Sequence, residues 1–221
     1  DAKDALVLGE ACGNISLDGI YFSYTPEKPL IQNVNLDVKE GQRVAIVGPT
    51  GCGKTTLINL LMRFYDVNDG TISVDGNPII SLTRRSLRKN YGMVLQETNL
   101  FSGTVMDNIR YGRLDATDEE CIAAAKLANA HDFIMKLPDG YDTVIGTAGR
   151  QLSGGERQRL SIARAVLVNP KILMLDEATA AVDTETEMNI QTALEELIKG
   201  RTTLSVAHRL STLRDADELI V

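Results

Sequence analysis

The chain has 221 residues, of which 43% are apolar, and this is enough for the core of one domain with subdomains or of two small domains. Its formal net charge of −7 disfavours nucleic acid as the main partner. Its three cysteines are widely spaced and favour neither a disulfide framework nor a zinc site, and such cysteine usage is typical of proteins in the reducing cytosol. No apolar run reaches the roughly 18 residues that span a bilayer, so any membrane crossing has to come from another segment.

The first half of the chain alternates between predicted strands and helices. Residues 1–14 are small and polar and are expected to form a linker, and the alternating stretch ISLDGIYFSY predicts a strand from Ile15, where folded structure should begin. A helix is expected over 53–64, directly after a strand apolar enough to be buried on both faces. Lysine and arginine along SLTRRSLRK are expected to form a solvated face. The other strands are predicted over 36–38, 43–48, 71–76 and 91–96.

The second half begins with a block, from about residue 102 to 168, in which the apolar pattern is helical. Strands are predicted again over 171–179, 202–208 and 217–221, with a helix over 185–199. Strands that alternate with helices imply a mainly parallel sheet and therefore an α/β fold. Because the last predicted strand stops at the final residue, we expect the chain to be a piece of a longer protein.

The stretch GPTGCGKTT, residues 48–56, fits the phosphate-loop pattern G-x-x-x-x-G-K-[ST] and lies between a predicted buried strand and a helix, as that motif requires. Its glycines allow backbone N–H groups to point at a β-phosphate, Lys54 can reach the β- and γ-oxygens, and the Thr55 hydroxyl can ligate Mg²⁺. A chance glycine turn is the alternative, but it gives no reason for a lysine at a helix N-terminus. The residues expected to bind the nucleotide here are Gly48, Pro49, Thr50, Gly51, Cys52, Gly53, Lys54, Thr55 and Thr56.

Two acids end the predicted strand ILML, at the edge of a parallel sheet where ligands bind. Successive side chains on a strand diverge, so we expect Asp176 to serve Mg²⁺ and Glu177 to face the γ-phosphate as the general base. The alternative for Glu177 is a solvated acid. His208, at the end of a later strand, is expected to touch the γ-phosphate and to orient water or Glu177; its alternative is a structural histidine.

The stretch LSGGERQR contains a second candidate phosphate site. Ser153 and Glu156 fit a capping box at the start of a helix. A capping box does not require the two consecutive glycines Gly154 and Gly155, which weaken a helix and leave its amides bare. They are explained if a phosphate has to approach closely.

With GPTGCGKTT, LSGGERQR, ILMLDEATAAVD and SVAHR in this order, the chain resembles the nucleotide-binding domain of an ABC transporter over residues 15–221. The resemblance implies a phosphate-loop (RecA-like) core with a mainly parallel sheet, an antiparallel β subdomain and a helical subdomain over about 97–168. It implies that two such domains, identical or different, pair head to tail around two ATP molecules. Ser153, Gly154, Gly155 and Glu156 then contact the ATP bound by the partner.

The resemblance also assigns roles that the residues alone do not. Tyr24 matches the aromatic that stacks on adenine, although by itself it predicts a strand residue packed inward. Gln96 matches the glutamine that contacts Mg²⁺ and the attacking water, and its alternative is an ordinary polar residue at a strand end. Asp183 matches a loop that senses the partner's site, and it also suits the N-cap of the helix that follows.

RFYDVNDGTISVDG and LQETNLFSGTVMDNIRYG most resemble exporters in which the ATPase is fused behind six membrane helices, with residues 1–14 as the linker. The expected function is therefore Mg²⁺-dependent ATP hydrolysis at the cytoplasmic face of a membrane, with a transmembrane domain and no nucleic acid as partner. One alternative is a soluble ABC ATPase of repair, translation or assembly. Another is a different phosphate-loop enzyme, such as a GTPase or a small-molecule kinase, but the guanine-reading motif N-K-x-D is missing and LSGGE is present. The expected catalytic residues are Lys54, Gln96, Glu177 and His208, and the expected metal ligands are Thr55, Gln96 and Asp176.

Overall fold

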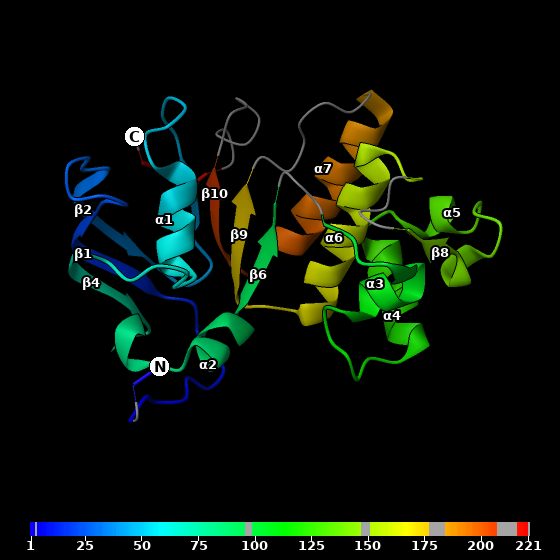
Figure 1. The fold of residues 1–221 in the computed structure, drawn as a ribbon. Helices are drawn as coiled ribbons and strands as arrows, with labels where there is room; N and C mark the ends of the chain where they lie inside the picture. Colours follow the sequence, from blue (N-terminus) through cyan, green and yellow to red (C-terminus); the bar gives the residue numbers. More distant parts are fainter. Residues whose placement is uncertain (3, 96–98, 147–150, 177–183, 207–215, 221) are drawn as a thin grey trace. The chain divides into compact units, whose positions relative to one another are not determined.

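The structure is a computed structural model that describes residues 1–2, 4–95, 99–146, 151–176, 184–206 and 216–220. The chain forms two compact units (Figure 1). The first comprises Asp1–Gly92, Lys171–Asp176 and Gly200–Val221, and the second comprises Met93–Pro170 and Glu177–Lys199.

One sheet of the first unit is antiparallel, with the strand order β2-β1-β4-β5. Along β1 the buried residues alternate as the sequence predicted, and the pairing is irregular between Leu17 and Ile20. Gly70 marks a close approach of two strands, because a Cβ at this residue would lie 2.3 Å from the carbonyl oxygen of Gly19. The strands are β1 (Ile15–Phe22), β2 (Ile31–Val38), β4 (Asp69–Val74) and β5 (Asn77–Pro78).

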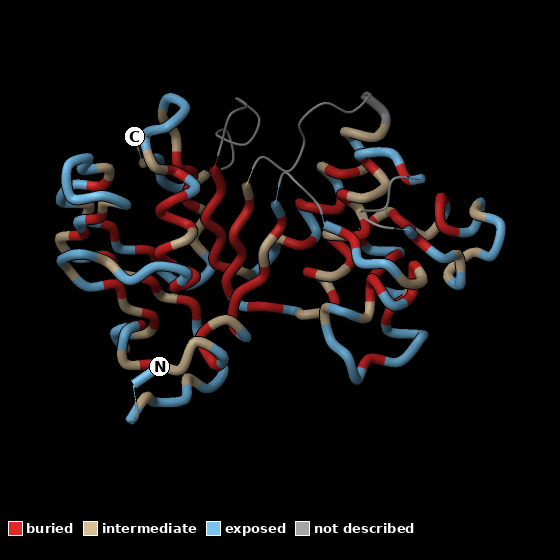
Figure 2. The backbone as a smooth tube through the Cα atoms, in the orientation of Figure 1, coloured by how far each residue is buried: buried red, intermediate tan, exposed pale blue. Residues whose placement is uncertain are grey.

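A five-stranded sheet has the order β11-β3-β10-β9-β6, and its pairs β10·β3, β10·β9 and β11·β3 are parallel. All five residues of β10 and the first four of β9 are buried, as Figure 2 shows in red. The parallel sheet predicted from the alternation of strands and helices is confirmed. The strands are β3 (Arg43–Ile46), β6 (Tyr91–Val94), β9 (Ile172–Asp176), β10 (Thr202–Val206) and β11 (Glu218–Ile220).

Ordered contacts begin before Ile15, where we expected folded structure to start. Leu6 forms a parallel bridge with Leu82, and the N–H of Ala11 donates to Oδ1 of Asn90 at 2.8 Å. The carboxylate of Asp75 accepts hydrogen bonds from the backbone N–H groups of residues 12, 13 and 14 at 2.7–3.2 Å. The sequence pattern missed this docking because side-chain acceptors far along the chain hold the segment, and such partners leave no local periodicity.

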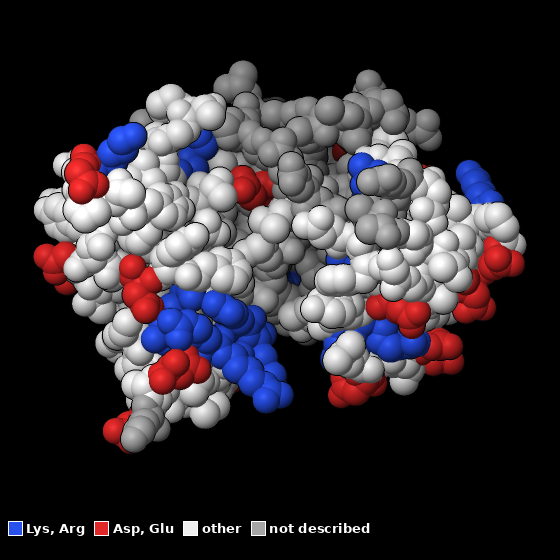
Figure 3. Space-filling model, viewed as in Figure 1, with Lys and Arg blue, Asp and Glu red and all other residues white. Residues whose placement is uncertain are grey.

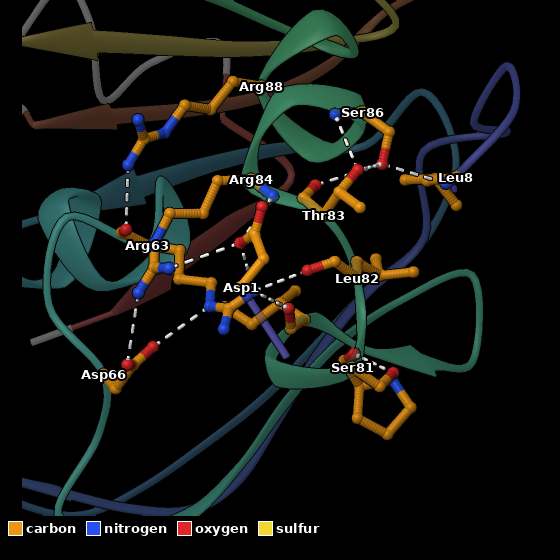
Figure 4. Close-up of polar contacts among 12 residues, drawn as sticks. Asp1, Leu8, Arg63, Asp66, Ser81, Leu82, Thr83, Arg84, Ser86 and Arg88 are labelled. Carbon is orange, nitrogen blue, oxygen red and sulfur yellow. Dashed lines mark hydrogen bonds and ion pairs between the residues drawn. The ribbon is translucent and has the colours of Figure 1, made fainter. Parts of the chain in front are cut away.

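The helix that follows the phosphate loop, α1 (Lys54–Leu61), is fixed at its C-terminal end by two arginines (Figure 4). Arg63 is 4% exposed and donates to the carbonyl oxygens of Ile79 at 3.0 Å and Leu82 at 2.6 Å. Arg88, on α2 (Arg84–Lys89), donates to the carbonyl oxygens of Met62 at 3.0 Å and Arg63 at 2.9 Å. The two bonds from Arg88 satisfy carbonyl groups just after the last residue of α1, which a helix end leaves without partners inside the helix.

Figure 3 shows the basic residues of α2 gathered on the surface. Arg85 and Lys89 are exposed, as expected for a solvated face. Arg88 departs from that expectation, because its guanidinium turns toward the end of α1. A short 3₁₀ turn, η1 (Ile79–Ser81), precedes α2.

The second unit is mainly helical, as predicted, but it also contains the antiparallel pair β7·β8. Threonine or serine begins three of its helices with a capping box, at Thr104, Thr117 and Ser153. Among the described residues, no helix is long and apolar enough to cross a membrane. The elements are β7 (Gly103–Thr104), α3 (Val105–Arg110), α4 (Asp118–Leu127), α5 (His131–Ile134), η2 (Gly140–Asp142), β8 (Val144–Ile145), α6 (Gly154–Val168) and α7 (Thr184–Ile198).

Candidate nucleotide-binding site

The predicted phosphate loop connects the end of β3 to the start of α1. Gly48, Gly51 and Gly53 have φ angles of 155°, 85° and 104°, which L-residues with side chains rarely adopt. No side chain of a described residue caps the N-terminus of α1, so its first amides remain available. A glycine-rich turn with free amides at a helix N-terminus is suited to bind an anion.

Lys54 is the first residue of α1 and is only 7% exposed. Its ammonium group donates to the carbonyl oxygens of Gly48 at 2.7 Å and Pro49 at 2.9 Å. Within the described part of the chain, no carboxylate forms an ion pair with it. The loop carbonyls therefore hold the charge of Lys54 beside the free amides, where a phosphate can pair with it.

The structure brings together two of the predicted metal ligands. The hydroxyl of Thr55 donates to Oδ2 of Asp176 at 3.3 Å. Strand register explains this proximity: Val206 of β10 pairs with both Asp176, the last residue of β9, and Ile46, the last residue of β3. The end of β9 is therefore level with the start of the phosphate loop.

The donor set fits Mg²⁺, which prefers oxygen ligands and keeps several waters or substrate oxygens in its shell. No group of three or more His, Cys, Asp or Glu side chains that could hold a metal occurs among the residues that the structure describes. A hydroxyl and a carboxylate leave the remaining positions to phosphate oxygens and water, which is the usual arrangement in a nucleotide site.

Tyr24 follows β1, and its side chain does not pack inward. The residue is 53% exposed, and its hydroxyl shares a hydrogen bond of 3.1 Å with Oγ1 of Thr56. The exposed ring is thus tied to the second residue after Lys54. The ring of Tyr65 lies 5.2 Å from that of Tyr24. The sequence did not predict this contact, because nothing in the spacing of the two residues links them.

In the second unit, Ser153 and Glu156 form the predicted capping box at the start of α6. The N–H of Ser153 donates to Glu156 at 2.7 Å, and the N–H of Glu156 donates to the Ser153 hydroxyl at 3.2 Å. Gly154 has no positive φ, and a Cβ built on it would meet only Nη2 of Arg157, at 4.0 Å. Within the described residues, neither backbone angle nor space requires glycine at 154.

Four predicted site residues lie outside the described residues: Gln96, Glu177, Asp183 and His208. Their roles remain predictions from the sequence.

The family model for "ABC transporter" matches residues 31–180. The chain belongs to the ABC transporter family. This match confirms the predicted family resemblance and the α/β fold with a phosphate-loop core. It also confirms that the chain is an ATP-binding domain of the ABC type.

Curated relatives and a solved structure extend the match to the whole of this chain. The ATP-dependent lipid A-core flippase of Syntrophus aciditrophicus (strain SB) is 53% identical over 221 residues, which are 100% of this chain and 37% of the flippase. A putative multidrug export ATP-binding/permease protein of Staphylococcus aureus (strain NCTC 8325 / PS 47) is 55% identical over 210 residues, 95% of this chain and 36% of that protein. The structure of a bacterial Atm1-family ABC exporter with ATP bound matches with a TM-score of 0.93 and 45% identity, over 100% of this chain and 39% of the exporter chain. The ABC domain thus spans little more than a third of the length of the relatives it matches.

Proposed function

We propose that this ABC domain binds ATP with Mg²⁺ and hydrolyses it to power export of a substrate across a membrane. The observation that carries the proposal is the arrangement of Lys54, Thr55 and Asp176 around the open N-terminus of α1. It offers amides and an ammonium group for phosphates, and beside them two oxygen donors for a divalent cation.

The binding step follows from the residues around the loop. The first amides of α1 and the ammonium of Lys54 bind the β- and γ-phosphates, and Tyr24 stacks on the base. Thr55 and Asp176 would hold Mg²⁺, together with Gln96. A cation held there would supply positive charge against the phosphate oxygens during transfer.

Hydrolysis needs a water aligned with the γ-phosphate. Glu177, directly after Asp176, polarises this water as the general base, and His208 orients it together with Gln96. Little covalent chemistry is required of the protein, since phosphoryl transfer is accelerated mainly by positioning and by stabilisation of charge.

A second ABC domain, identical or different, completes each site head to tail. The signature residues Ser153, Gly154, Gly155 and Glu156 then contact the γ-phosphate of ATP held by the partner's loop, and Asp183 senses that site. Gly154 supports this step, because the fold of the described residues does not require a glycine there. A bound phosphate that approaches the helix N-terminus would require one.

The partner that crosses the membrane is proposed to be a transmembrane domain of the same full-length protein, joined through residues 1–14. The relatives named as a flippase and as an export ATP-binding/permease protein support an exporter over a soluble repair, translation or assembly factor. The ABC domain would then work at the cytoplasmic face, with about 97–168 as its helical subdomain.

Two measurements test the proposal. Purified chain should hydrolyse ATP only with Mg²⁺, and Lys54→Ala should abolish this activity, whereas Lys39→Ala, which removes an exposed lysine paired with Asp37 in the antiparallel sheet, should not. The full-length protein should stay in the membrane pellet after a carbonate wash. A full-length protein released by carbonate would favour the soluble alternative, and undiminished hydrolysis by the Lys54 variant would contradict the proposed site.

A further inference from the structure

An aromatic cluster surrounds the proposed base-stacking residue. The rings of Phe22 and Tyr24 meet edge to face, with centroids 5.0 Å apart and an interplanar angle of 85°. The rings of Tyr24 and Tyr65 do the same at 5.2 Å and 87°, and Phe22 and Tyr65 are 5.8 Å apart. Each member therefore contacts the other two. Phe22 is 5% exposed and anchors the cluster in the core, whereas Tyr24 and Tyr65 are each about half exposed.

Tyr24 is tied to both ends of α1. Its hydroxyl bonds to Thr56, in the first turn of the helix, and its ring meets Tyr65, which follows the last turn. An eight-residue helix is roughly 12 Å long, so these two contacts hold the ring against the same rigid element that begins with Lys54. The base-binding ring and the phosphate-binding amides thus share one support.

The residues around Tyr65 are themselves held in place. Its ring packs against that of Phe22, with centroids 5.8 Å apart, and Phe22 is buried. The chain on either side of Tyr65 is held by the ion pair between Nε of Arg63 and Oδ1 of Asp66, 3.0 Å long (Figure 4). Because its backbone is held in place, the ring of Tyr65 can restrict the motion of the Tyr24 ring that it contacts.

We propose that Tyr65 is a positioning residue of the nucleotide site, which holds the ring of Tyr24 in place for stacking on the base. The inference rests on the proposed role of Tyr24 in the ATP site. An exposed ring at the end of a strand has several rotamers open to it, and freezing it on binding costs affinity. Tyr65 removes that cost before the nucleotide arrives, so it governs the part of the affinity that depends on the base.

The test compares ATP with tripolyphosphate, which offers the phosphates without a base. Tyr65→Ala should raise the Kd for ATP about three- to tenfold, the range expected for the loss of one edge-to-face aromatic contact, and should leave the Kd for tripolyphosphate unchanged in calorimetric titrations. Hydrolysis at saturating ATP should keep its kcat. Tyr65→Phe should restore the Kd for ATP, since it keeps the ring, and Phe64→Ala, which removes an equally exposed neighbouring ring that contacts Arg88, should match the wild type.

A spectroscopic readout separates positioning from general stability. The chain contains no tryptophan, so Tyr24→Trp introduces a single reporter at the stacking position. Fluorescence anisotropy of this tryptophan should fall when Tyr65→Ala is added and should not fall with Phe64→Ala.

The outcomes are distinguishable. Suppose that Tyr24→Ala raises the Kd for ATP and not the Kd for tripolyphosphate. If Tyr65→Ala then raises both Kd values equally, or changes neither, the inference is wrong and the proposed role of Tyr24 stands. If Tyr24→Ala itself leaves the Kd for ATP unchanged, the stacking role of Tyr24 is wrong and the inference falls with it.

Discussion

The Thr55 hydroxyl lies 3.3 Å from a carboxylate oxygen of Asp176, which joins the first turn of α1 to the end of β9. Residues far apart in the sequence thereby present two oxygen donors at one point. The parallel register of β3, β10 and β9 fixes that point at the edge of the sheet where the phosphate loop begins.

Asp176→Asn should remove most of the Mg²⁺ dependence of ATP binding. The amide has no negative charge, so we expect the Kd for Mg·ATP to rise by about tenfold or more, while the Kd measured in EDTA stays near the wild-type value. Titrations of the variant with and without Mg²⁺ check this, with Asp37→Asn, an exposed acid of the antiparallel sheet, as the control. A wild-type ratio of the two Kd values in Asp176→Asn would rule out a metal role for this carboxylate.

Gly154→Ala should separate stability from function. A Cβ at 154 meets only the end of the Arg157 side chain at 4.0 Å, and alanine favours a helix more than glycine does. We expect the free energy of unfolding in urea to be unchanged or to rise by about 0.5 kcal/mol. ATP-driven dimerisation and hydrolysis should nevertheless fall, because the methyl group blocks the approach of the partner's γ-phosphate. A variant that hydrolyses ATP at the wild-type rate would show that nothing has to approach Gly154.

Asp75→Asn should lower stability in a pH-dependent way. Burial acts to raise the pKa of Asp75, but hydrogen bonds from Asn14, Cys12 and Gly13 outweigh it, so the pKa is held below its ordinary value of 3.8. A carboxyl whose pKa is depressed by folding adds stability above its unfolded-state pKa and loses it as pH falls through its lower folded-state pKa. At pH 7 the variant should therefore be less stable by about 1–3 kcal/mol, and the difference should shrink below about pH 4. Urea unfolding of the variant and the wild type at pH 7 and pH 3.5 measures this difference in stability. If the difference is the same at both pH values, the ionised carboxylate of Asp75 is not its cause.

Alkylation of Cys52 should prevent ATP binding. Its sulfur lies 4.0 Å from the ammonium nitrogen of Lys54, so a maleimide there occupies the space of the phosphates. Cys12 is also exposed and Cys121 is buried, so the experiment uses Cys12→Ser protein, in which Cys52 is the accessible thiol. ATP added first should protect Cys52 from the reagent. Full ATP binding after stoichiometric labelling would place the nucleotide elsewhere.

The sequence predicted those parts of the fold that leave a local pattern. Alternation in β1, the continuous apolar strands β9 and β10, and the glycine loop before α1 were read directly, because each depends on neighbours within a few residues. The capping box of Ser153 and Glu156 was predicted for the same reason.

Contacts between distant residues had no such pattern. The docking of residues 6–14 depends on Asn90 and Asp75, and the orientation of Arg88 depends on carbonyl groups at the end of α1. The contact between Tyr65 and Tyr24 likewise arises only when the residues after α1 meet the residues after β1 in the folded chain. Their chemistry can be recognised in the sequence, but their partners are determined by the tertiary fold.

The central claim is that each ATP site is built from the phosphate loop of one domain and the signature of another. Lys54→Ala destroys the loop of a chain and leaves its signature intact, whereas Ser153→Arg blocks the signature and leaves its loop intact. Each variant alone should be inactive. Mixed in equal amounts, they should recover roughly a quarter of the wild-type rate, because about half of randomly formed dimers are mixed and each of these has one intact site of two. A mixture as inactive as its components, although crosslinking shows that the two variants form mixed dimers, would contradict a shared site.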